Sequence, residues 1–100
     1  MNLIESVLAE LEEDYVGLWL LFKEARMAES SGANISEIVL TTTRELIRNP
    51  NVVVGDFVNQ DFLAWTYPQD RIMEEIVARL TKLNRDPDIG EVCWFSMKKG

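Results

Sequence analysis

The sequence predicts one α+β domain, with three to four helices and a small antiparallel β-sheet in the winged-helix-like order α-α-β-β-α-β. Apolar residues recur every three or four positions in three segments, which is the spacing of amphipathic helices. Three consecutive valines and a later aromatic run are typical of strands, and an apolar segment ends the chain. One hundred residues are enough for one core, so we expect residues 1–100 to form a single domain.

The first helical segment begins after Asn2, the expected N-cap, which has Glu5 at the capping-box position. Gly17 favours a break, because glycine is a poor helix former. The sequence therefore leaves open whether residues 1–29 form one helix or two. The apolar stripe of this segment consists of Leu3, Ile4, Val7, Leu8, Leu11, Tyr15, Leu18 and Phe22.

The second helix is expected at residues 35–48, after a turn at residues 30–34. Asn34 is its expected N-cap, again with an acid at the capping-box position. Pro50 ends this helix, because a proline disfavours helical backbone at the residue before it. The apolar stripe consists of Ile35, Ile38, Val39, Thr42, Leu46 and Ile47.

A β-hairpin is expected between the second and third helices. The β-branched residues 52–54 predict its first strand, and residues 62–67 predict its second. Residues 58–61 are the expected turn between them. Such a hairpin beside helices is the arrangement in which a winged-helix protein presents its DNA-binding wing.

The third helix is expected to begin near Pro68, with Thr66 and Gln69 at capping-box spacing. A loop at residues 84–90 and a short strand at residues 91–97 follow it. The apolar face of the helix consists of Ile72, Met73, Ile76, Val77, Leu80 and Leu83.

The charge of the chain argues against nucleic-acid and membrane partners. Ten basic and 17 acidic residues give a net charge of −7, which repels phosphate groups and anionic lipids and attracts basic proteins. Residues 1–14 hold five acids and no base, and residues 51–70 hold three acids and no base. The expected hairpin thus lacks the lysines and arginines with which a wing contacts DNA. The longest nearly apolar run has eight residues, far short of a membrane span.

The sequence offers no catalytic or metal-binding constellation. It contains no histidine, which excludes Ser-His-Asp triads and histidine metal ligands. Cys93 lies in an apolar segment and is expected to be a buried, unreactive thiol. As a single cysteine it indicates a reducing compartment, so we expect the cytoplasm. Residues 86–91 resemble the start of a calcium loop, but Gly90 is fifth rather than sixth and the final glutamate is missing. We expect no enzyme activity, cofactor or metal.

The best candidates for partner binding are acids and aromatics. Acids at the middle of the first helical segment, or at its break, and acids flanking hairpin aromatics are typical of a charged rim around an interface hot spot. The simpler interpretations are a solvated helix face for the acids and core packing for Trp19, Trp65 and Trp94. The candidate partner-binding residues are Glu10, Glu12, Glu13, Asp14, Asp56, Asp61, Trp65, Tyr67 and Asp70.

The third helix is locally basic, which is the best argument for nucleic acid. It is also explained by pairing within the helix, since Glu75 and Arg79 lie four residues apart. The bases concerned are Arg71, Arg79, Lys82 and Arg85.

Four motifs resemble a family of small uncharacterised bacterial domains, some of which are immunity proteins of contact-dependent or polymorphic toxin systems. The motifs are the helix "GLWLLF", the helix-to-strand step "ELIRNPNVVVGDF", the strand "FLAW" and the terminal strand "CWF". The resemblance covers roughly residues 15–97. It implies a bacterial cytoplasmic protein and an inhibitor role, and it transfers no functional residue.

These observations favour a non-catalytic acidic binding protein, an immunity-type inhibitor that occludes a basic toxin, for which a nuclease is one example. A dimerising or scaffold domain that pairs through an exposed sheet edge is the first alternative. A winged-helix regulator is less favoured, and an enzyme with a carboxylate-only site is least favoured.

Overall fold

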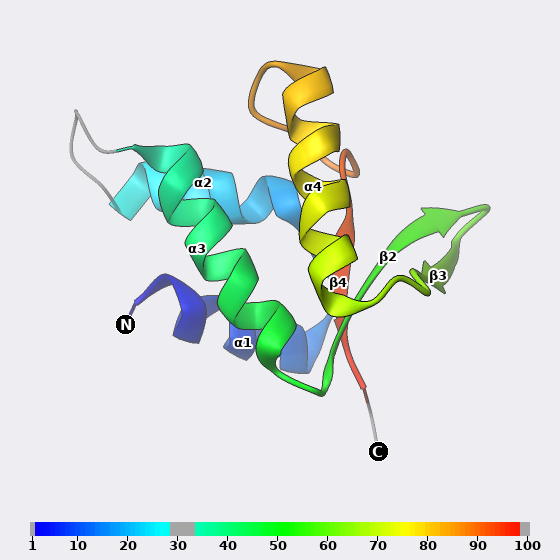
Figure 1. Ribbon diagram of the computed structural model, residues 1–100. Helices are drawn as coiled ribbons and strands as arrows, with labels where there is room; N and C mark the ends of the chain where they lie inside the picture. The colour runs from blue at the N-terminus through cyan, green and yellow to red at the C-terminus, as the bar shows by residue number, and fades with distance from the viewer. Residues whose placement is uncertain (1, 29–33, 99–100) are drawn as a thin grey trace.

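The computed structural model describes residues 2–28 and 34–98, and it confirms the predicted α+β class (Figure 1). The predicted turn at residues 30–34 lies, apart from Asn34, outside the described residues. In chain order the elements are α1 (Leu3–Glu13), β1 (Val16–Gly17), α2 (Leu18–Ala28), α3 (Ile35–Arg48), β2 (Val52–Val58), β3 (Asp61–Ala64), α4 (Gln69–Leu83) and β4 (Trp94–Met97).

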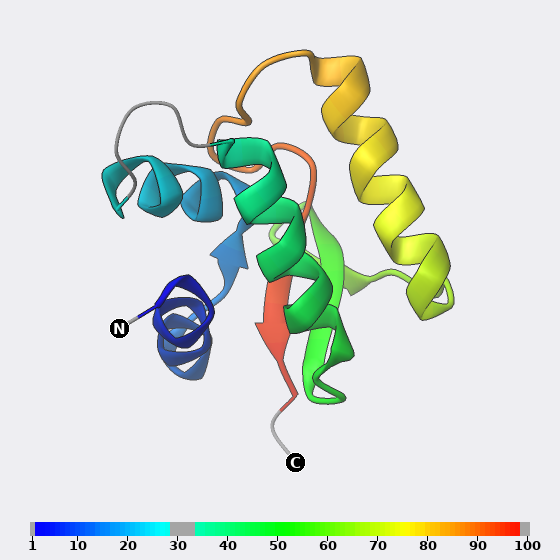
Figure 2. The ribbon, with the colours of Figure 1, turned by 60° about the vertical axis from the view of Figure 1, so that its left-hand side comes forward.

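The sheet is antiparallel throughout and has the strand order β1-β4-β2-β3. Its central residue is Phe95, which pairs with Val16 of β1 on one side and with Val54 of β2 on the other. All three residues are buried. They share one face, because paired residues of neighbouring strands point to the same side of a sheet. Figure 2 shows α3 lying across this face, with β2 and β4 running side by side behind it.

The N-terminal segment forms two helices, which answers the question that the sequence left open. Asp14 follows α1 in extended conformation, and Val16 and Gly17 then pair with β4. Position 17 in β1 requires glycine, because the Trp19 side chain lies very close to its backbone. A Cβ atom on Gly17 would lie 2.5 Å from Cδ1 of Trp19. The missing side chain therefore lets the indole of α2 pack over the strand.

The core is built mainly from α1, α2, α3 and the inner face of the sheet. Helix α4 contributes only Ile76 to the fully buried residues. Cys93 is buried as expected, and burial raises the pKa of its thiol. The three tryptophans are each half-buried, and Trp65 packs against the buried core, as the simpler interpretation expects for it. The other buried apolar residues are Val7, Leu11, Val16, Leu18, Leu21, Phe22, Ala25, Val39, Leu46, Ile47, Val54 and Phe95.

Two of the predicted helix caps are confirmed and one is wrong. Oδ1 of Asn2 and of Asn34 each accept the backbone N–H three residues later, at 3.0 and 3.1 Å. The predicted cap at Thr66 does not form, because α4 begins after Pro68 and has no side-chain cap. Gln69 instead donates its side-chain amide to the carbonyl of Ile47 at 2.8 Å, which ties the start of α4 to the end of α3.

The hairpin is longer at its tip and shorter at its base than predicted. Its turn contains only Asn59 and Gln60, with φ of 51° and 71°, so Val58 and Asp61 belong to the strands. Positive φ at both central residues defines the two-residue turn that suits the twist of a hairpin. The second strand ends at Ala64. In Figure 1 the hairpin tip extends away from the helices.

The last strand begins later than the predicted residues 91–97, at Trp94. Val92 has φ of 72°, a conformation that is strained for a β-branched residue. The N–H of Cys93 bonds back to the carbonyl of Glu91 at 3.0 Å, which closes a tight turn. This turn prevents strand pairing before Trp94.

Candidate partner-binding surface

The face of the sheet opposite the buried core residues carries a cluster of four aromatic side chains, Tyr15, Phe57, Phe62 and Trp94, which we call the aromatic face. Phe57 pairs with Phe62 across the hairpin, and Trp94 pairs with Gly55 two residues before Phe57, so all three point to one side. Tyr15 reaches them from the segment before β1. Its ring centroid lies 4.8 Å from that of Phe57 and 5.2 Å from that of Phe62.

The cluster is packed internally and open to solvent. Phe57 meets Phe62 at 5.6 Å and Trp94 at 5.1 Å, both edge to face. Tyr15 is 43% exposed and Phe57 is 36% exposed. Gly55 makes room for the arrangement, because a Cβ atom there would lie 2.7 Å from Cζ of Phe62. Contiguous exposed aromatics held in place by their neighbours are typical of protein interfaces.

Acidic side chains border the aromatic face. Glu13 and Asp14 immediately precede Tyr15, and both acids are exposed. Asp61 is also exposed, but it pairs with Val58, so strand alternation directs it to the opposite face of the hairpin from Phe57 and Phe62. A shallow hollow of about 580 Å³ lies beside the rings, lined by Asp14, Tyr15, Phe57, Gln60, Gly90 and Trp94. A smaller hollow of about 250 Å³ shares Asp14 and Tyr15 and is otherwise lined by Leu11, Glu13, Ser96 and Met97.

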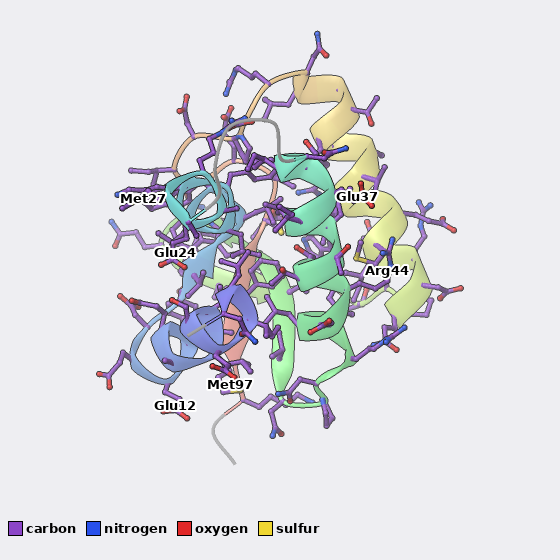
Figure 3. All side chains as sticks on the ribbon, turned by 90° about the vertical axis from the view of Figure 1, so that its left-hand side faces the viewer. Glu12, Glu24, Met27, Glu37, Arg44 and Met97 are labelled. Atoms are coloured by element: carbon purple, nitrogen blue, oxygen red, sulfur yellow. The ribbon has the colours of Figure 1, made fainter. Side chains whose placement is uncertain are left out.

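Only some of the acidic side chains are neutralised by ion pairs with arginines. Among the described residues, every ion pair contains one of four arginines, and the paired acids are Asp56, Glu74, Glu75, Asp86, Asp88 and Glu91. The five acids of residues 5–14 and the two acids Asp61 and Asp70 take part in none of these pairs. In Figure 3, Glu12 projects from α1 on the side of the molecule opposite Arg44. Uncompensated negative charge therefore gathers around the end of α1.

The structure brings some of the sequence-predicted residues together and separates others. Glu13 and Asp14 border the aromatic face, while Glu10 and Glu12 are exposed closer to the start of α1 and Asp61 lies on the opposite face of the hairpin. Tyr67 is exposed, with the Arg71 guanidinium 5.6 Å from its ring centroid. Asp70 lines a separate hollow beside Arg44, Arg48 and Met73, where α3 meets α4.

Trp65 and Asp56 lie on the other side of the sheet, where they are engaged with α4. Nε1 of Trp65 donates to Asp56 at 2.7 Å. Arg79 of α4 stacks on the indole, 4.5 Å from its centroid, and bonds to Asp56 at 3.0 Å and to Glu75 at 2.9 Å. It also donates to the carbonyl of Val92 at 2.8 Å. Burial lowers the pKa of Arg79, but its bonds to Glu75 and Asp56 outweigh burial and raise the pKa overall.

Four residues of the aromatic face were absent from the sequence-predicted set. A local signal existed for Phe57 and Phe62, which lie at equal distances from the two-residue turn and must therefore share a face. No local signal existed for Tyr15 and Trp94. They join the cluster only because β1 and β2 pair with β4, a contact between segments about 80 and 40 residues apart in the chain.

Comparison of the chain with protein-family models, curated proteins and solved structures finds no match. The resemblance to bacterial immunity domains therefore stays a prediction from the four motifs. Within residues 2–28 and 34–98, no helix is both long and apolar enough to cross a membrane.

Replacing Arg79 by methionine is expected to lower the free energy of unfolding by about 2 kcal/mol, because it leaves the Val92 carbonyl without its donor and Asp56 without its ion-pair partner. The loss is modest because the side chains of Arg79 and Asp56 are each about one-third exposed and are screened by water. Urea denaturation measures the change. Arg71→Met is the matched control, since Arg71 contacts the exposed side chains of Glu74 and Tyr67 and its loss should cost less than about 0.5 kcal/mol. Equal costs for the two variants would contradict the role given to Arg79.

Stability is expected to fall in acid through two ion pairs. Hydrogen bonds from Arg26 hold the pKa of Asp86 below its ordinary 3.8, and bonds from Arg85 and the Asp88 amide hold that of Glu91 below 4.5. Folding thus favours both ionised carboxylates. Their contribution is complete above these ordinary values and disappears as the pH falls through the lower values of the folded state.

The urea midpoint measured from about pH 6 to about pH 2 should therefore drop on acidification. In the double variant Asp86→Asn, Glu91→Gln it should start lower and depend less on pH. A double variant with the same pH dependence as the original chain would show that other carboxylates cause the acid loss.

Proposed function

We propose that this protein is a non-catalytic acidic binding protein, an immunity-type inhibitor that docks its aromatic face on a basic protein and occludes that protein's working cleft. A toxin with a cationic cleft, such as a nuclease, is the kind of partner that this acidic surface would bind. The observation that carries the proposal is the aromatic face, in which Tyr15 and Phe57 are exposed and Phe62 and Trp94 are half-buried. It is bordered by acids that have no ion pair among the described residues.

The two parts of this surface have different physical roles. Exposed acids act at long range, so Glu10, Glu12, Glu13 and Asp14 steer a cationic partner and speed its association. The aromatic rings act at contact, where burying large rigid side chains supplies most of the binding free energy. The acids lie at the border and the rings at the centre, which is the usual anatomy of a protein interface.

The positions of the basic groups favour a protein partner over nucleic acid. The arginines of α4 and the following loop are largely held in ion pairs, which leaves them little capacity for phosphates. The hairpin tip carries Asn59, Gln60 and Asp61 and no base. Exposed residues of α3 include Glu37 and Glu45 as well as Arg44 and Arg48, a mixed surface that gives no net attraction to DNA.

Pairing of two copies through β3 is the second candidate function. β3 is an edge strand with only four residues, and it exposes Leu63 by 52%. Its outer backbone groups have no strand beside them among the described residues. Such an edge is able to accept another strand. A molar mass of about 23 kDa in solution, twice that of the chain, would identify this alternative.

The proposal is tested by co-expressing the protein with the product of the gene immediately upstream and measuring the affinity of the purified pair. We expect a stoichiometric complex with a basic protein, whose affinity falls as salt is added. The double variant Tyr15→Ser, Phe57→Ser should weaken it at least about a hundredfold, because two central aromatic anchors are lost.

Tyr67→Ser is the matched control, because Tyr67 is similarly exposed but lies outside the aromatic face. It should change the affinity less than about threefold. A neighbouring gene product without basic character or without binding would refute the inhibitor role. Equal losses for the double variant and the control would refute the assigned surface.

A further inference from the structure

We propose that the hollow beside Trp94 is a binding site for a guanidinium group, an arginine side chain presented by the basic partner. This proposal rests on the proposed function and deepens it, because it names the chemical group that the aromatic face recognises. The hollow is lined by three aromatic rings, one carboxylate, one amide and one glycine, and among the described residues it has no basic side chain.

The aromatic walls offer the flat surface on which a guanidinium stacks. Phe57 stands edge-on to Trp94 at an interplanar angle of 89°, which fixes the indole from one side. Gly90 lines the hollow near the indole, and a Cβ atom at this position would come within 4.0 Å of Cζ2 of Trp94. The φ of 84° at Gly90 favours glycine, so this edge of the ring stays uncovered. An arginine plane is attracted to such a ring by cation–π and stacking forces.

Asp14 supplies the opposite charge in the same hollow. Its Oδ1 atom accepts the backbone N–H of Tyr15 at 2.7 Å, which orients the carboxylate. Neither of its oxygens has an ion-pair partner among the described residues. Carboxylates bind guanidinium groups more selectively than ammonium groups, because the planar donors form two parallel hydrogen bonds.

The chain already contains the completed form of this arrangement. On the other side of the sheet, Arg79 stacks on Trp65 and binds the carboxylate of Asp56. The hollow contains two of these three groups, an indole from Trp94 and a carboxylate from Asp14. No arginine of residues 2–28 or 34–98 lines the hollow. We infer that the partner supplies the arginine, since net charge −7 selects cationic partners.

The test is an NMR titration of the ¹⁵N-labelled protein with N-acetyl-arginine amide, in the absence of any partner protein. The three indole N–H signals are assigned with Trp19→Phe, Trp65→Phe and Trp94→Phe. We expect the signals of Trp94 and Gly90 to shift with a dissociation constant on the order of millimolar, as befits one side chain. The citrulline analogue, which has the same shape without the charge, should bind at least about tenfold more weakly, and the lysine analogue several-fold more weakly.

Two variants locate the charge. Asp14→Asn should weaken arginine binding at least about fivefold, while Glu37→Gln, an equally exposed acid on α3, should leave it unchanged. An unshifted Trp94 signal, equal binding of arginine and citrulline or lysine, or an Asp14→Asn variant that binds normally would each overturn the site.

The two proposals fail in different ways. A complex that needs the aromatic face, together with no arginine binding, would refute the guanidinium site alone. Normal arginine binding together with no basic protein partner would refute the inhibitor function and leave the guanidinium site in place.

Discussion

Strand β4 lies between β1 and β2, so that Phe95 packs against Val16 on one side and Val54 on the other. This pairing joins the beginning, the middle and the end of the chain around one buried ring. It also determines which side chains lie on the opposite face of the sheet. Because side chains alternate along a strand, burying Phe95 turns Trp94 outward, and the same pairing brings Tyr15 within reach of the hairpin. The aromatic face is thus a consequence of how the core closes.

Both faces of the hairpin carry aromatic rings beside carboxylates, but only the inner face also has an arginine that pairs with them among the described residues. On the inner side, Arg79 neutralises Asp56 and covers Trp65, so these groups tie α4 to the sheet. On the outer side, aromatic rings stand beside carboxylates with no arginine among the described residues. The first arrangement stabilises the fold, and because its groups contact one another, they have little capacity to bind a partner. The second leaves apolar area and negative charge uncompensated, which a basic partner would satisfy.

Local signals in the sequence predicted much of the fold. The asparagine caps, the bounds of α3 and the hairpin depend on neighbouring residues and were correct or nearly so. The site was harder to predict. Trp65 and Asp56 lie near other acids in the sequence, which predicts a binding role, but alternation along the strands places them toward α4. The meeting of Tyr15 with Trp94 depends on strand pairing over long distances, for which residue spacing carries no signal.

Hydroxyl-radical footprinting of the protein alone and in complex with the neighbouring gene product tests most directly whether the aromatic face is the binding surface. The account predicts that oxidation of Tyr15, Phe57 and Trp94 falls several-fold in the complex. Oxidation of Met27, which is 77% exposed on α2, and of Tyr67 should stay unchanged. Protection of Met27 or Tyr67 with continued oxidation of Tyr15 and Phe57 would contradict the account, because the partner would then cover a different surface.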